Sequence, residues 1–317
     1  MNRIKRAAAL LLVLAMALSL TGCSLFDTRM ARALQKISKS DNLHVDLLDD
    51  MVIQVKSGEQ TLPFTVALTG GADLYFSPFQ AKAELLLEWP GFQRRHLLYL
   101  EKSEGVLTIY NNVNGGEAWE KYNFATNSRD FKADGLKYVT QVADTFHQVE
   151  TPDVTDGSLR YDGEVPGSAI RGFLDLYHVK ERLEADYGVY LPDDLLSNLH
   201  SVPVSLWLNA QGELDLILLD PGPMLNDVLG RLLNQTRQAS GLSQLPMNLT
   251  LDGNTIAIQL SGYDALTDLL IPEEAHAALA DGPEFWKLHK ARLPLQGAGF
   301  AIGRLYRGSF SCLLPNA

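Results

Sequence analysis

The chain has 317 residues, of which 46% are hydrophobic and 21% charged, and its formal net charge is −11. This composition is ordinary for a folded globular protein, and the length suffices for one large domain or two related halves. The acidic balance excludes a nucleic-acid partner, because negatively charged phosphates would be repelled and no basic stripe is present.

The first 22 residues are organised like a secretory signal peptide. A basic segment at residues 3–6 precedes an apolar run at residues 7–18, and small residues follow. The apolar run is too short to remain in a bilayer as a spanning helix. The next residues, Leu20-Thr21-Gly22-Cys23, resemble the lipobox of bacterial lipoproteins. That resemblance implies cleavage before Cys23 and attachment of diacylglycerol to its thiol.

Lipidation at Cys23 has consequences for charge and location. Cleavage removes Arg3, Lys5 and Arg6 but no acidic residue, so the formal charge changes from −11 to −14. The second cysteine, Cys312, is then left without an intramolecular partner, and we expect no disulfide. Two acyl chains provide a stable anchor. We therefore expect a lipid-anchored protein on the extracytoplasmic face of a cell membrane.

The first half of the chain has the pattern of a β-meander. A tether and a short amphipathic helix, with apolar spacing from Met30 to Ile37, are predicted within residues 23–42. Apolar residues then alternate with polar ones from 43 to 122, which predicts six or seven antiparallel strands with one buried face. We interpret Gly70-Gly71 and Gly115-Gly116 as turns between strands.

The hydrophobic period becomes helical over residues 136–149, and Thr151-Pro152-Asp153 ends that pattern. We divide the body there, into a first half at 43–150 and a second half at 151–280. Residues 281–317 form a tail of different composition. Because neither half has an obvious way to cover its sheet edges, we expect both to share one continuous sheet. The second half is predicted to contain a strand at 158–165, helices at 168–177, 180–187, 192–199 and 224–233, a hairpin at 202–218, and a hairpin at 247–260 that turns at 252–254.

Several stretches carry a resemblance to a known family. Gly116–Tyr122 has the pattern Gly-x-x-Trp-x-Lys-Tyr, and Tyr161–Gly167 leads into a predicted helix. The second half adds Val202–Leu208 and Leu214–Asp220, which precede another helix. Together these stretches resemble the unclosed-barrel lipoproteins of the LolA, LolB, LppX and LprG superfamily, especially uncharacterised members from Gram-positive bacteria.

The resemblance covers roughly residues 30–275 and leaves out the helix-rich insert at 178–200 and the tail beyond 280. It implies an α+β fold, in which a strongly curved antiparallel sheet forms an unclosed half-barrel around helices, with two similar strand–helix halves. It also implies an apolar cavity that holds acyl chains of lipids or of other lipoproteins.

No motif in the sequence predicts catalysis. The seven histidines lack metal-ligand spacing, and no nucleophile elbow or phosphate loop is present. Adjacent carboxylates, such as Asp49-Asp50 and Glu273-Glu274, are interpreted as solvated turns or helix N-termini. We therefore predict no catalytic residue, metal site or cofactor. Trp119 and Tyr122 are expected either in the core, along a cavity, or on an outward recognition edge.

Two functions follow as hypotheses. The first is a lipoprotein that binds a lipid or another hydrophobic molecule in an apolar cavity, lined by Val142, Phe146, Val228 and Leu232 on two helical stripes. The alternative is an anchored interaction module of the cell envelope with a packed interior and no small-molecule ligand, whose protein partner is unknown. An enzyme ranks below both.

Overall fold

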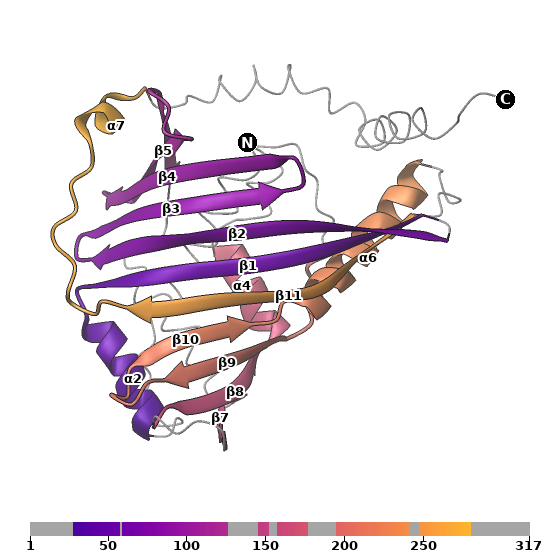
Figure 1. Cartoon of the computed structure of the whole chain (residues 1–317), viewed down its shortest axis with the longest axis horizontal. Coiled ribbons are helices and arrows are strands. Elements are labelled where there is room, and N and C mark those ends of the chain that lie inside the picture. The colour runs from indigo at the N-terminus through magenta and orange to yellow at the C-terminus, as the bar shows by residue number, and fades with distance from the viewer. Residues whose placement is uncertain are drawn as a thin grey trace.

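A computed structural model describes residues 28–57, 59–125, 145–151, 157–176, 195–240 and 247–279, and within these ranges the strands form one open antiparallel sheet (Figure 1). The sheet order is β6-β5-β4-β3-β2-β1-β11-β10-β9-β8-β7. The first group of strands is β1 (Asn42–Ser57), β2 (Gln60–Phe76), β3 (Phe79–Trp89), β4 (Phe92–Ser103), β5 (Val106–Val113) and β6 (Trp119–Ala125). The second group is β7 (His147–Val149), β8 (Leu159–Val165), β9 (Val202–Leu208), β10 (Leu214–Leu219) and β11 (Met247–Ser261).

The predicted single sheet is confirmed, and its seam lies between the first and the last strand. β1 pairs with β2 on one side and with β11 on the other, from His44↔Ser261 to Ser57↔Met247. Every other neighbouring pair in the sheet is also consecutive in the chain. The two edge strands, β6 and β7, are therefore consecutive as well, and the sheet is open between them.

Two of the sequence interpretations are wrong. Gly70-Gly71 does not turn the chain but lies inside β2, where a Cβ on Gly70 would stand 2.1 Å from the carbonyl oxygen of Glu84. The predicted hairpin at 247–260 is the single strand β11. Its expected turn is a β-bulge opposite Met51 and Val52, with Gly253 at φ 64°. Glycines and bulges bend strands as well as end them.

Four helices accompany the sheet in the described residues: α2 (Thr28–Lys39), α4 (Gly167–Leu176), α6 (Gly222–Ser240) and α7 (Glu273–Ala277). The predicted helices near 30–37, 168–177 and 224–233 correspond to α2, α4 and α6. Residues 195–198 of the helix predicted at 192–199 form a turn instead.

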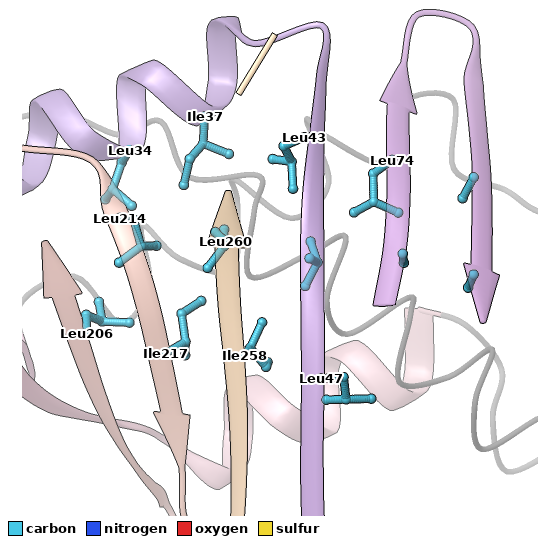
Figure 2. Packing of buried hydrophobic residues seen from close by; sticks show 14 of the residues in the cluster. Leu34, Ile37, Leu43, Leu47, Leu74, Leu206, Leu214, Ile217, Ile258 and Leu260 are labelled. Atoms are coloured by element: carbon cyan, nitrogen blue, oxygen red, sulfur yellow. The ribbon is translucent and has the colours of Figure 1, made fainter. Parts of the chain in front are cut away.

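The main core lies between α2 and one face of the sheet. Leu34 and Ile37 of α2 lie beside Leu43, Leu214 and Leu260, which come from three strands (Figure 2). All five side chains are buried. Ile170 of α4 and Met224 of α6 pack against the same cluster. We call the sheet face that carries this cluster the inner face, and the opposite one the outer face.

A second, smaller cluster covers part of the outer face. Residues 262–279, which we call the strap, run from the end of β11 along the ends of the strands to β5 (Figure 1). The Tyr75 hydroxyl donates to the carbonyl of Thr267 at 2.5 Å. Farther along, Ala275 of α7 is buried against Tyr99 and Tyr110. The strap thereby shields aromatic side chains of β4 and β5.

Other predictions lie outside the described residues. These are the signal peptide (1–22), Cys23 with its tether, residues 136–144 of the helix predicted at 136–149, the helix at 180–187, and the tail at 281–317. The end of the helix predicted at 136–149 is wrong, because His147–Val149 form the edge strand β7, which pairs with β8. Within the described residues, no helix combines the length and the apolar character needed to cross a membrane.

Candidate ligand-binding face

The end of the sheet at the β1–β2 turn carries exposed apolar side chains on the inner face. β1 and β2 project beyond β3 there, because the β2–β3 pairing stops at Ala67↔Glu88 (Figure 1). Alternation places Phe64 and Leu62 on the inner face, opposite Ile53 and Val55. Phe64 is 37% exposed and Leu62 is 65% exposed. The apolar inner face therefore continues beyond the part that the core covers.

The β3–β4 turn adds aromatic side chains at the same end of the sheet. Trp89 and Phe92 are partners in the register, and their rings stack with centroids 3.7 Å apart and planes 4° from parallel. Phe92 is 37% exposed. Alternation from the buried Leu85 through Leu87 puts both rings on the inner face. An aromatic pair thus lies at the rim of the exposed surface.

Helix α6 lies against the unpaired side of β11. β10 pairs with β11 only from Gln259 to Ile256, so the edge of β11 before Ile256 has no neighbouring strand there. The Asn226 amide covers that edge, because it donates to the carbonyl of Leu251 at 2.9 Å and accepts from its N–H at 2.5 Å. Two hydrogen bonds to one residue fix the position of the helix beside the strand.

The four predicted cavity residues are only partly described. Val142 lies outside the described residues. Phe146 packs against the main core, and its ring covers Gly163, where a Cβ would stand 2.7 Å from Cδ1. Val228 and Leu232 are half-buried on α6. A cavity shared by these four residues stays a prediction.

A polar network interrupts the inner face at β4, β5 and β6. His96 and Asn111 are buried, and His96 Nδ1 lies 2.9 Å from Asn111 Oδ1. The Asn111 amide donates to Glu120 at 2.6 Å, and the Tyr122 hydroxyl donates to the same carboxylate oxygen at 2.8 Å. Burial lowers the pKa of His96, although the hydrogen bond to Asn111 Oδ1 opposes that effect. His96 is therefore held as the neutral imidazole near pH 7.

The Asp49-Asp50 pair is not a solvated turn. Both residues lie within β1, and Asp49 is on the inner face, only 7% exposed. Burial, reinforced by the charge of Asp50, raises the pKa of Asp49 to about 6. Asn254, which adjoins the bulge of β11, is also buried. Its register partner is Met51, two residues along β1 from Asp49. Asp49 Oδ1 and Asn254 Oδ1 both lack a hydrogen-bond partner.

Sequence reasoning missed these buried polar groups, although alternation contained a signal for them. Asn111 follows Leu107 and Ile109 at a spacing of two, and Asp49 follows Val45 and Leu47 in the same way. Trp119 and Tyr122 lie on opposite faces of the sheet. Tyr122 is buried in the main core, whereas Trp119 packs beside Tyr99 under the strap. The pair at Glu273-Glu274 begins α7, as predicted.

Among the described side chains, no group of three or more His, Cys, Asp or Glu residues is arranged to hold a metal ion. The exposed apolar side chains of the inner face and the polar network beside them are the candidate site in the described part of the chain.

Comparisons with known proteins identify no family for this chain. No family model and no curated protein matches the sequence. Among solved structures, the chain is similar to a DUF1329 family protein from Desulfovibrio piger, whose crystal structure has a resolution of 1.75 Å. The TM-score is 0.22 and the identity 8%, over 76% of this chain and 92% of that chain. We base no functional inference on a likeness of this size.

Proposed function

We propose that this protein is a membrane-anchored extracytoplasmic lipoprotein that binds a lipid or another hydrophobic molecule on the inner face of its sheet. In this proposal the sheet is an unclosed half-barrel around helices, and Cys23 carries the lipid anchor. The exposed apolar end of the inner face, at Leu62, Phe64 and Phe92, is the observation that carries the proposal.

The energetics of that surface favour a ligand. Burying one Leu or Phe side chain is worth about 1.5–3 kcal/mol. Several such side chains lie at this end, and the face that carries them continues into a core where Leu43 is buried in one cluster with Leu34 of α2. Exposed apolar surface of this kind marks a binding site rather than a packed interior. An acyl chain supplies the matching shape and chemistry.

The anchor places the site near its ligand. The signal peptide and Leu20-Thr21-Gly22-Cys23 support the proposal that lipidated Cys23 holds the domain at a membrane. The charge of −14 expected after cleavage keeps the body away from anionic headgroups. A binding role is proposed in preference to an enzymatic one, because the sequence contains no nucleophile, metal or acid–base motif.

An anchored interaction module is the second candidate. The observation that favours it is the filled core beneath α2, where Ile37, Leu43 and Leu260 leave no exposed surface. In that case the stacked rings of Trp89 and Phe92 would contact a protein partner rather than a lipid.

Photolabelling of the full-length protein in phosphatidylcholine nanodiscs tests the proposal. The probe is hexadecyl methyl ether with a diazirine in the middle of its chain. We expect labelled peptides from β2, from the β3–β4 turn and from α6. Phe64→Glu is expected to reduce labelling roughly tenfold, because an ionised side chain replaces an apolar contact of one to two kcal/mol.

The matched control is Thr65→Glu, one residue along β2 and on the outer face. It adds the same charge one residue farther from the turn, and labelling should not change. Equal labelling of both variants, or labels confined to outer-face peptides, would overturn lipid binding and favour the interaction module.

A further inference from the structure

Like Asp49 Oδ1 and Asn254 Oδ1, an atom of His96 is buried on the inner face without a hydrogen-bond partner. His96 is 3% exposed, and its Nε2 has no hydrogen bond. A buried polar atom in this state costs about 1–3 kcal/mol. Natural proteins retain few such atoms, and each one calls for a functional or structural reason.

The polar network fixes which ring nitrogen of His96 carries the proton. The NH2 group of Asn111 donates to Glu120, so this end of the Asn111 amide faces the carboxylate. Asn111 Oδ1 then faces His96 Nδ1 as an acceptor, and Nδ1 must carry the hydrogen. With the imidazole neutral, Nε2 presents a lone pair. The network therefore holds His96 as a pure acceptor toward the interior.

The position of His96 connects this lone pair to the exposed apolar surface. Along β4, alternation places Phe92, Arg94 and His96 on the inner face, in order from the exposed turn toward the core. Leu85 is the register partner of His96 and is also buried. A hydrophobic chain that enters at Phe92 and follows β4 reaches the imidazole after two inner-face positions.

Charges near His96 restrict which kind of ligand group can donate a hydrogen bond to its Nε2. The Arg94 guanidinium lowers the pKa of His96 and Glu120 raises it, so charges of both signs act on the imidazole, and the guanidinium disfavours a cationic donor such as an ammonium group. A carboxylate has no hydrogen to offer and would meet the lone pair with a negative charge. A neutral hydroxyl satisfies both conditions.

We propose that the ligand of the inner face is a hydroxyl-bearing amphiphile, such as a long-chain alcohol or a monoacylglycerol, and that its hydroxyl donates a hydrogen bond to His96 Nε2. This inference rests on the proposed function and adds the polar group of the ligand. A bound water would satisfy the same lone pair, and the experiment below distinguishes the two.

Two diazirine probes of equal chain length test the proposal on the full-length protein in phosphatidylcholine nanodiscs: hexadecanol and its methyl ether. Phosphatidylcholine itself offers no hydroxyl donor. One hydrogen bond is worth about 1 kcal/mol, so the alcohol should label the inner face roughly fivefold more strongly than the ether at equal concentration. His96→Phe should remove this preference while the labelling by the ether persists. His44→Phe, on the outer face of β1, should preserve the preference.

Imidazole ¹⁵N spectroscopy of the unaltered protein gives an independent readout, which matters if His96→Phe fails to fold. Hexadecanol should move the Nε2 resonance of His96 away from the position of an unbonded acceptor nitrogen, and the ether should not. Equal labelling by the two probes with an unmoved resonance would overturn the proposal in favour of water. The absence of inner-face labelling by either probe would instead contradict the proposed function.

Discussion

Asp49, His96 and Asn254 are polar side chains buried on the inner face, and each has an oxygen or nitrogen without a hydrogen-bond partner. Their environments differ. Asp49 lies beside a second carboxylate, whereas His96 is held by an amide. Burial raises the pKa of the acid and lowers the pKa of the base, and both shifts favour the neutral form.

Asp49→Asn should stabilise the protein in a pH-dependent way. Burial raises the pKa of Asp49 from 3.8 to about 6, so the folded protein takes up this proton before the unfolded chain does. The cost of the buried charge is therefore complete above pH 7 and disappears as the pH falls from 6 to below 4. After allowance for solvent screening, the variant should gain about 1–2 kcal/mol at pH 7.5 and nothing at pH 3.5.

Urea unfolding at both pH values measures this difference. Asp268→Asn, at an exposed position of the strap, is the control and should change the free energy of unfolding by less than about 0.5 kcal/mol at either pH. An equal gain for Asp49→Asn at both pH values would show that the carboxyl is not buried as described.

At the scale of elements, alternation predicts strands well and predicts their ends poorly. The six strands from β1 to β6 follow the period-two pattern of residues 43–122. Gly70-Gly71 and Gly253 resemble turns in the sequence because turns, bends and bulges use the same small residues. Position 70 requires glycine because the carbonyl of Glu84 on the neighbouring strand leaves no room for a Cβ. A contact with another strand has no signature in the local sequence. The partners His96 and Asn111 likewise depend on register, which the sequence does not specify at single-residue precision.

Two glycine variants test the close approach of β2 and β3. Gly70→Ala should destabilise the protein by about 2–3 kcal/mol, because the new Cβ would collide with the backbone at Glu84. Gly230→Ala, within α6 and with no atom within 4 Å of a Cβ, should stabilise it by about 1 kcal/mol. Thermal unfolding of both variants measures whether each one is less or more stable than the unaltered protein. An unchanged stability of Gly70→Ala would show that β2 and β3 can move apart.

The strap offers a test of the outer cluster. Ala275 is fully buried against Tyr99 and Tyr110, and the Tyr110 hydroxyl donates to Glu101 at 2.6 Å and lies 3.0 Å from His276 Nδ1. Ala275→Asp would place a charge there. We expect hydrogen exchange across the strap to rise about tenfold or more, because a buried unpaired charge costs more than 1.4 kcal/mol.

Ala277→Asp, two residues along α7 and exposed, is the matched control for the strap variant. It adds the same charge to the same helix, so slow exchange should persist. Similar acceleration in both variants would mean that the helix is sensitive to charge rather than to the contact at Ala275.

For the molecule as a whole, the sequence predicted one sheet shared by two halves but not its strand order. The seam between β1 and β11 joins residues about two hundred positions apart, and pairing at that distance leaves no local signature. The sequence predicted an apolar cavity lined in part by Val228 and Leu232 of α6. It did not predict the exposed apolar end at Phe64 and Phe92, because that end depends on which strands project beyond their neighbours.

The proposed membrane attachment concerns the whole molecule, and Cys23→Ala should abolish it. We expect this variant to leave the membrane fraction, because the acyl chains on Cys23 are the proposed anchor. Cys312→Ala is the control and should remain bound. Fractionation in high salt measures both, and full retention of Cys23→Ala would contradict the lipid anchor.

The seam between β1 and β11 also sets the order in which the sheet can be completed during synthesis. β2 to β6 can pair as they emerge, but one side of β1, a strand of 16 residues, stays open until Ser261 has been made. An open edge of that length readily pairs with other chains. Translation that stops before Met247 should therefore produce aggregates rather than a stable half-sheet, and export in an unfolded state would postpone the hazard until the last strand is present.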